Sequence, residues 1–492
     1  VRVLPSAQPV AILDVSRNRF VFVADPAGNC TPPQPLIVNN SGDSILSWSM
    51  QTNQNWLEIS AKSGINSNKV MVSVVPDGLA VGDYTASISI VGANALNSPQ
   101  DIQVHLKIKR SSDLESPIGS LDTPLENAVV RSSIPVTGWA LDDIGIENVK
   151  IYRNPRGDED RMPNGLVYIG DAVFIENARP DVEILYPDHP MNFKAGWGFM
   201  LLTNILPGGG NGQYVIHAIA TDREGNEVTI DTRTISADNI NAVLPFGAID
   251  TPIQGDTISG KHYANFGWVL SPHPNLIPFD GSTIKVFIDG VFVGNPEYNH
   301  YREDVAALFP GYMNSDGAVG YHLINTTKLA NGMHTIVWGV RDNAGNSAGI
   351  GSRFFSVLNS SPDKNVNFSR GLFNRSDLSG FRLDPLPLDC RKGFAAQPLQ
   401  AVDDLMSGKK IISIRMLERL VIRLNSAEGG TNYSHGYLKV GDYLRRLPAG
   451  STLEAGVFYW IPGPGFIGKY DLCFIDPNLK RLRKVQVDVR PE

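Results

Sequence analysis

Hydrophobic and polar residues alternate with a period of two along many short segments of this chain. Residues 70–74, 84–90 and 101–108 follow this pattern, and Gly-containing turns separate such segments. Alternation of this kind predicts strands with one buried face. Residues 1–110 are therefore predicted to form a β-sandwich, in which residues 1–18 are either the first strand or an N-terminal arm that pairs with a neighbour.

The same region resembles the bacterial BACON-type immunoglobulin-like domain. The motifs that carry this resemblance are Trp56-Leu57, Ser63-Gly64 and Gly82-Asp83-Tyr84. In that family such motifs mostly build the sandwich, and buried aromatic side chains dominate its core, so Trp56 is expected in the core. The family is also linked with carbohydrate contact, which leaves a sugar-stacking role for Trp56 as the alternative.

The middle of the chain is an internal duplication, because several motifs of residues 111–238 return in the same order in residues 239–360. The matching motifs are Asp122-Thr123-Pro124 with Asp250-Thr251-Pro252, Gly138-Trp139 with Gly267-Trp268, Arg179-Pro180-Asp181 with Arg302-Glu303-Asp304, and Asp222 to Asn226 with Asp342 to Asn346. Both units resemble the immunoglobulin-like modules repeated in secreted bacterial surface proteins. Trp139 and Trp268 are expected to be buried against the opposite sheet of each sandwich.

Each repeat also carries an insertion with the pattern of a short helix. An Asp near the start, apolar residues three and four apart and a terminating Pro predict one or two helical turns after Arg179 and after Arg302. The pairs Arg179–Asp181 and Arg302–Asp304 are expected to fix the insertions through a buried guanidinium. A ligand-binding role is the alternative.

Residues 361–400 are expected to be an extended linker or a segment packed along a neighbour, and residues 401–492 a fourth β-sandwich. The fourth domain resembles the putative-Ig, cadherin-like repeats of bacterial surface proteins. The motifs that carry this resemblance are Leu447-Pro448-Ala449-Gly450, Trp460-Ile461-Pro462 and Gly468-Lys469-Tyr470. Trp460 is expected to have a structural role.

Composition narrows the classes of function. The chain has 492 residues, of which 42% are hydrophobic and 19% charged, which is enough apolar surface for several folded domains. The net charge of −7 comes without a basic stripe, which disfavours nucleic-acid binding. No segment has the ~20 consecutive apolar residues of a membrane span. No signal peptide opens the chain, and a start at Val1 suggests a processed chain. An extracellular or cell-surface location is inferred from the domain type.

The chain has only three cysteines. Cys390 and Cys473 could form one disulfide in an oxidising compartment, which would leave Cys30 unpaired. The other interpretation is that all three are unpaired and serve as small hydrophobic residues.

Two turns carry clustered oxygen-bearing side chains that could bind calcium. The candidates are Asp222, Glu224 and Asn226 in the first repeat and Asp342 and Asn346 in the second. The favoured interpretation is a plain turn, in which Asp caps the backbone and Gly takes a positive φ. Asp142 and Asp143, together with Glu147, are expected to form a solvated acidic loop.

These patterns predict an all-β chain of tandem immunoglobulin-like sandwiches, arranged in series as a rigid rod, with short helical insertions in the two central repeats. No cofactor is expected apart from the calcium candidates, and no catalytic motif such as His-Glu-x-x-His or Gly-x-Ser-x-Gly occurs. The first hypothesis is an exported, non-catalytic structural or adhesive protein of the bacterial cell surface. It would act through protein partners or self-assembly, as in a filament or an envelope complex. A carbohydrate-binding accessory protein is the alternative, and an enzyme with an unrecognised site is the third hypothesis.

Overall fold

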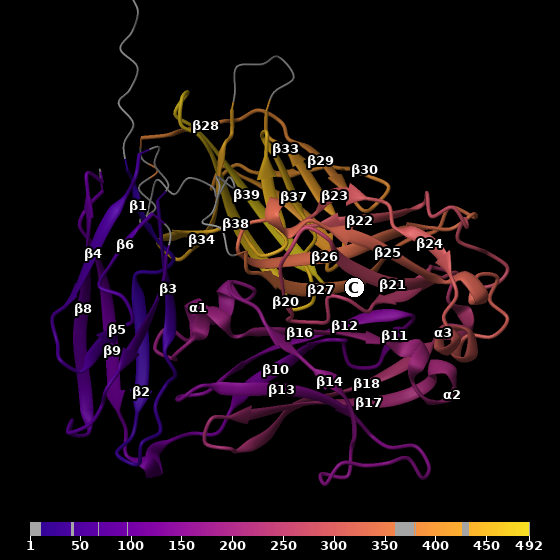
Figure 1. Cartoon of the computed structure of the whole chain (residues 1–492), viewed down its shortest axis with the longest axis horizontal. Coiled ribbons are helices and arrows are strands. Elements are labelled where there is room, and N and C mark those ends of the chain that lie inside the picture. The colour runs from indigo at the N-terminus through magenta and orange to yellow at the C-terminus, as the bar shows by residue number, and fades with distance from the viewer. Residues whose placement is uncertain are drawn as a thin grey trace, which may run out of the picture.

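The computed structural model describes residues 11–40, 44–66, 68–95, 97–359, 378, 380–425 and 432–491. These residues form eight β-sheets, which pack in pairs as four successive sandwiches (Figure 1). Helices are restricted to short turns between strands. The predicted all-β fold class of tandem sandwiches is therefore confirmed.

The first sandwich packs the sheet β1-β3-β7-β5 against the sheet β2-β9-β8-β4-β6. Its strands are β1 (Leu13–Val15), β2 (Arg19–Ala24), β3 (Gln34–Asn40), β4 (Ser47–Thr52), β5 (Leu57–Ile59), β6 (Ser63–Ile65), β7 (Asn68–Val74), β8 (Gly82–Ala93) and β9 (Gln100–Ile108). Trp56 lies buried in its core, edge-on to Tyr84, with ring centroids 6.5 Å apart. β1 pairs with β3, so the end of the predicted arm belongs to this domain's own sheet, whereas residues 1–10 lie outside the described residues.

The first repeat packs the sheet β10-β12-β16-β15 against the sheet β11-β18-β17-β13-β14. Its strands are β10 (Ile118–Thr123), β11 (Ala128–Val130), β12 (Ser133–Leu141), β13 (Ile146–Arg153), β14 (Val167–Asp171), β15 (Val173–Phe174), β16 (Gly196–Leu202), β17 (Asn211–Asp222) and β18 (Glu227–Asp238). Its helical segments are α1 (Pro180–Leu185) and α2 (Pro207–Gly210), with 3-10 turns η2 (Asn192–Lys194), η3 (Thr203–Ile205) and η4 (Asn239–Asn241); η1 (Ser111–Asp113) precedes it.

The second repeat has the same plan, with the sheet β19-β21-β25-β24 against the sheet β20-β27-β26-β22-β23. Its strands are β19 (Phe246–Ile249), β20 (Thr257–Ile258), β21 (Tyr263–Leu270), β22 (Ile284–Ile288), β23 (Val291–Gly294), β24 (Glu297–His300), β25 (Val319–Ile324), β26 (Gly332–Arg341) and β27 (Ser347–Val357). Its helical segments are α3 (Glu303–Leu308), η5 (Ser315–Gly317) and η6 (Thr326–Lys328). The predicted helical turns correspond to α1 and α3.

The structure corrects the expectation that Trp139 packs between the sheets of the first repeat. On β12, Gly138 faces the interior, and a Cβ placed there would lie 2.6 Å from the indole of Trp197, which is fully buried. Because side chains alternate along a strand, Trp139 then faces outward. It packs under α1 against Tyr186, with ring centroids 5.3 Å apart.

Trp268 of the second repeat is displaced from the intersheet core in the same way. Gly267 makes room on the inner face for the fully buried ring of Trp338, which would lie 3.1 Å from a Cβ at that position. Trp268 is buried on the outer face of β21, beside Phe246 and Phe309 of a separate cluster. In both repeats the Gly-Trp pair therefore places glycine inside and tryptophan outside.

The fourth sandwich begins earlier than predicted. It packs the sheet β31-β32-β39-β38-β34-β35, with β28 paired to β39, against the sheet β30-β29-β33-β37-β36. Its strands are β28 (Arg382–Leu383), β29 (Asp389–Lys392), β30 (Gln397–Leu399), β31 (Val402–Asp404), β32 (Lys409–Arg415), β33 (Leu420–Arg423), β34 (His435–Val440), β35 (Tyr443–Arg445), β36 (Ser451–Glu454), β37 (Val457–Trp460), β38 (Gly468–Asp476) and β39 (Arg481–Arg490). The strands β28 to β30 occupy part of the expected linker 361–400, of which residues 361–377 and 379 lie outside the described residues.

The disulfide between Cys390 and Cys473 is not formed, and all three cysteines are free thiols. Cys390 points into the core between the two sheets of the fourth sandwich. Cys473 sits between Leu472 and Phe474 on β38, which both point into that core, so alternation turns it to the other face of its sheet. Burial raises the pKa of Cys390 to about 12 and that of Cys473 to about 11.

The four sandwiches do not form the rod that a simple series would give. The fourth sandwich folds back onto both repeats (Figure 1). A Cβ at Gly198 of the first repeat would collide with the backbone of Pro464, and the rings of Phe354 and Phe466 join the second repeat to the fourth domain at 6.3 Å. The chain is therefore a closed arrangement, in which domains far apart in sequence share one core.

Candidate functional site

All four sandwiches line one groove, with a volume of about 870 Å³. The strands that reach it include β1, β23, β35 and β36, and each of them stands at the end of the strand order in its sheet. The outer edge of such a strand can offer backbone N–H and C=O groups to an added strand, although on β1 those of Leu13 already bond the side chain of Asn97. The groove is therefore suited to an extended polypeptide segment.

Charged side chains of both signs face this groove. His334 lies beside Asp289, with Nδ1 2.5 Å from the carboxylate, and its Nε2 lies 2.8 Å from the carbonyl oxygen of Ala330. Burial alone would lower the pKa of His334, but the charge of Asp289 and these hydrogen bonds outweigh burial and raise it. Burial also raises the pKa of Asp14 to about 6 and lowers that of Arg17 to about 10.

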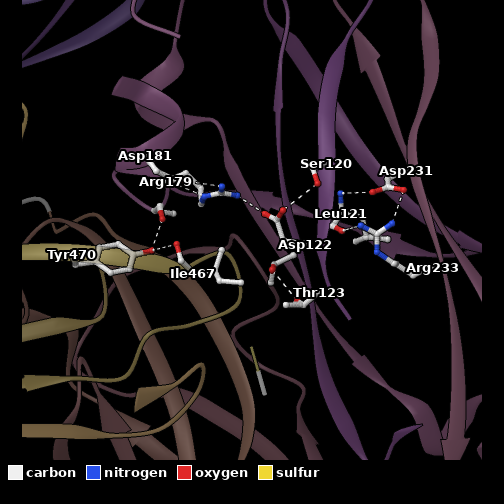
Figure 2. A network of polar contacts seen from close by, with 12 residues as sticks. Ser120, Leu121, Asp122, Thr123, Arg179, Asp181, Asp231, Arg233, Ile467 and Tyr470 are labelled. Carbon is white, nitrogen blue, oxygen red and sulfur yellow. Dashed lines mark hydrogen bonds and ion pairs between the residues drawn. The ribbon is translucent and has the colours of Figure 1, made fainter. Parts of the chain in front are cut away.

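Arg179 holds the insertion of the first repeat through a forked ion pair, as predicted for its pairing with Asp181 (Figure 2). Its Nε and one terminal nitrogen donate to Asp181 at 2.9 and 2.7 Å, and the other terminal nitrogen donates to Asp122. Close by, the Tyr470 hydroxyl of the fourth sandwich donates to the carbonyl oxygen of Ala178 at 2.6 Å. The network therefore fixes the insertion and meets the fourth domain.

The second repeat contains the same arrangement in a more exposed form. Arg302 donates to Asp304 at 2.7 Å and to Asp250, the counterpart of Asp122. The Asp of the Asp-Thr-Pro turn is the partner that the sequence analysis missed. Its recurrence together with the Arg-x-Asp motif was the available signal.

The insertion of the first repeat makes a second contact with the fourth domain. Glu183 on α1 forms a two-pronged ion pair with Arg445 on β35, and their side chains are 11% and 14% exposed.

Trp460 of the fourth domain is fully buried, and its indole N–H donates to the carbonyl oxygen of Ala449 at 3.2 Å. These contacts are structural in kind.

The predicted calcium residues separate into two groups. Asp222 accepts hydrogen bonds from the backbone and side-chain nitrogens of Asn226, both at 2.8 Å, and Asp342 accepts from Asn346 in the same way at 2.8 and 2.9 Å. These four residues close turns around glycines with positive φ, as the favoured interpretation expected. Glu224 does not join its neighbours in this turn.

Glu224 instead faces Asp142 and Asp143, which are buried rather than part of the expected solvated loop. Carboxylate oxygens of the three residues lie within 4.8 Å of one another. Burial, together with the negative charges of Asp142 and Asp222, raises the pKa of Glu224 to about 7. Burial likewise raises the pKa of Asp142 to about 6. Sequence reasoning missed this cluster because its two segments are distant along the chain.

Comparisons with known proteins find similar solved structures, and those named here match at low identity. No family model and no curated protein matches it. Among solved structures, the insect immune protein hemolin is 11% identical with a TM-score of 0.23, over 98% of this chain and 100% of hemolin. The EC3-6 structure of protocadherin gammaB7 is 10% identical with a TM-score of 0.18, over 97% of this chain and 100% of that chain.

A third solved structure that matches part of the chain is a Bacteroides ovatus GH5 xyloglucanase. It is 14% identical with a TM-score of 0.17, over 24% of this chain, and the match spans only 21% of that enzyme. TM-scores this low carry no further argument about this chain. None of the helices that the structure describes is both long and apolar enough to cross a membrane.

Proposed function

We propose that this chain is an exported, non-catalytic structural or adhesive protein of the bacterial cell surface that assembles with other protein chains. In this proposal the first sandwich is of the BACON type. The observation that carries the proposal is the groove that all four sandwiches line, to which the first sandwich, the second repeat and the fourth sandwich contribute edge strands. Edge strands are the elements through which β-proteins add a strand from a partner.

The packing of the domains supports the same function. The ion pair between Glu183 and Arg445 and the hydrogen bond from Tyr470 to Ala178 hold the fourth sandwich against the first repeat. A groove between domains keeps its shape only when such contacts fix the domains. Preorganisation of this kind lowers the entropic cost of binding an extended segment.

The experiment below tests whether a segment from a second copy of this chain binds in the groove. Light scattering coupled to size-exclusion chromatography, with electron microscopy of the same fractions, should show a mass that rises with protein concentration. Val293→Lys, on the groove strand β23, should abolish this rise because the added charge blocks the groove. The control is Val91→Lys on β8, a strand valine of similar exposure (50% against 41%) that is not among the lining residues. A wild-type chain that stays monomeric at every concentration would contradict self-assembly.

The carbohydrate-binding alternative relied on Trp56 as the residue that would stack on a sugar. Trp56 is 8% exposed and packs against Tyr84, so its face is not free to stack on a sugar. A glycan array probed with wild type and Trp56→Ala would test this point. Binding that depends on Trp56 without loss of folding would favour the alternative.

A further inference from the structure

Three buried carboxylates meet at the junction between the first sandwich and the first repeat. Asp142 and Asp143 follow directly on β12, and Glu224 lies in the turn between β17 and β18. Asp142 is 3% exposed and Asp143 5% exposed. Oxygens of the three side chains lie within 4.8 Å of one another.

Four carboxylate oxygens of the cluster are buried and have no hydrogen-bond partner among the described residues. They are Oδ1 of Asp142, Oδ1 of Asp143 and both carboxylate oxygens of Glu224. The other oxygens are used. Oδ2 of Asp142 accepts two backbone N–H groups at 2.8 Å, and Oδ2 of Asp143 accepts the Lys109 ammonium at 2.8 Å. The side chains are thus held in place while one oxygen of each Asp and both of Glu224 stay open.

The charges of the cluster do not balance. Lys109 is the one cation that forms an ion pair with these carboxylates among the described residues, so three potential negative charges face a single positive charge. Buried carboxylates without a counter-charge are costly, and proteins neutralise them by protonation, by a cation side chain or by a metal ion. The unpartnered oxygens are the kind of ligand that hard divalent cations take.

The second repeat shows what the same positions look like without the acids. Ser271, Pro272 and Ala344 stand where the first repeat has Asp142, Asp143 and Glu224. The Ser271 hydroxyl donates to the carboxylate of Asp342 at 2.9 Å, so an uncharged donor stands where the first repeat has a second carboxylate. The fold of the turn therefore needs none of the three acids, which argues that their presence in the first repeat serves a ligand.

We propose that Asp142, Asp143 and Glu224 bind one Ca²⁺ ion that fastens the first sandwich to the first repeat. Ca²⁺ takes oxygen ligands at roughly 2.3–2.6 Å, so oxygens on opposite sides of the ion stand about 4.6–5.2 Å apart, which suits this cluster. Mg²⁺ requires about 2.0–2.1 Å and a near-ideal octahedron, and it usually keeps several water ligands. The link to the first sandwich runs through Asp143, which also holds Lys109 and the backbone N–H of Glu115 in the connecting segment.

Calorimetric titration of the full chain, purified in EDTA and exchanged into metal-free buffer, tests the site with CaCl₂. Wild type should bind one equivalent, and Glu224→Gln should weaken binding at least tenfold. The control is Glu227→Gln, which alters an exposed carboxylate three residues further along and should leave binding unchanged. A folded wild type that binds no Ca²⁺, or that binds Mg²⁺ more tightly, would overturn the proposal, as would equal affinity in Glu224→Gln.

Thermal melting gives a second readout whose sign distinguishes a ligand site from a purely structural one. In EDTA, Glu224→Gln should melt at or above the wild-type temperature, because it removes a buried unpaired charge. In excess CaCl₂ the order should reverse, since only the wild type gains the stabilisation of a bound ligand. An order that Ca²⁺ does not change would contradict the proposal, and Asp143→Asn repeats the comparison if Glu224→Gln fails to fold.

Discussion

The duplication supplies two versions of one ion-pair network that differ in burial. In the first repeat the side chain of Arg179 is 9% exposed and that of Asp122 is 21% exposed. In the second repeat the corresponding values for Arg302 and Asp250 are 34% and 33%. The same substitution at the two arginines therefore tests whether burial sets the strength of the network.

Arg179→Met would leave Asp122 and Asp181 facing each other without their cation. Removal of one partner from a buried pair costs about 3–5 kcal/mol, whereas an exposed pair contributes about 0–1 kcal/mol. Because Asp122 keeps some contact with water, we expect Arg179→Met to cost about 2–4 kcal/mol and Arg302→Met to cost about 1 kcal/mol or less. Burial already raises the pKa of Asp122 against the opposing effect of Arg179, so loss of the arginine should raise it further.

Urea unfolding followed by tryptophan fluorescence measures the difference, with the transition midpoint as the observable because a four-domain chain need not unfold in two states. A second substitution, Asp122→Asn in the Arg179→Met background, should recover part of the loss because it removes the unpaired charge. Equal midpoint shifts for Arg179→Met and Arg302→Met, or no recovery in the double variant, would refute the reasoning.

Three other substitutions test separate contacts. Tyr470→Phe removes the donor to the buried carbonyl of Ala178 and should lower the free energy of unfolding by about 1–3 kcal/mol in urea titrations. His334 has a pKa raised above its ordinary 6.5, so its ion pair with Asp289 stabilises the fold fully below pH 6.5 and is lost as pH rises through the folded-state pKa. The urea midpoint of wild type should therefore fall as the pH rises above 6.5, and this fall should be smaller in His334→Gln. Gly138→Ala places a Cβ against the backbone of β10 and against an indole ring, so circular dichroism should show a midpoint below that of wild type or no folded state.

Two controls accompany these substitutions. Tyr301→Phe removes a hydroxyl from a side chain that is 63% exposed, and Gly380→Ala adds a Cβ with no atom within 4 Å. Both should change the free energy of unfolding by no more than about 0.5 kcal/mol, so the midpoint should stay close to that of wild type. A loss in Tyr470→Phe no larger than in Tyr301→Phe, a wild-type pH profile in His334→Gln, or a Gly138→Ala midpoint equal to wild type would each contradict its prediction.

The alternating pattern was sufficient to predict the strands, but in the repeats it was insufficient to predict which face of a strand points into the sandwich. Period-two alternation separates two faces of a strand but does not say which face is inside when both are covered. On β12 the inner face is covered by the facing sheet and the outer face by α1, so both carry apolar residues. Trp139, on the outer face, was therefore predicted to lie in the core between the sheets. Gly138 was the signal for the inner face, because a glycine there leaves room for a large ring from the facing sheet.

The candidate sites were harder to predict because they join distant segments. The Arg179–Asp181 pair is local and was predicted, but its third member, Asp122, comes from the end of β10, 57 residues earlier. The cluster of Asp142 and Glu224 depends on β12 and β17 ending at the same end of the sandwich, which alternation alone cannot show. Divergence between the two repeats is a sequence signal that could have marked this cluster.

The difference between the repeats also explains why the chain closes instead of extending. In the first repeat, Glu183 on α1 meets Arg445 of the fourth sandwich in a nearly buried ion pair. The matching position on α3 of the second repeat is Ala306, which offers no carboxylate. A buried ion pair adds little net stability, because desolvation of the two charges is costly. It favours one docking partner over others, because each buried charge would be unpaired against a surface without the opposite charge. The fourth sandwich therefore has an electrostatic reason to dock on the insertion of the first repeat. The groove lies between domains whose arrangement this ion pair helps to fix.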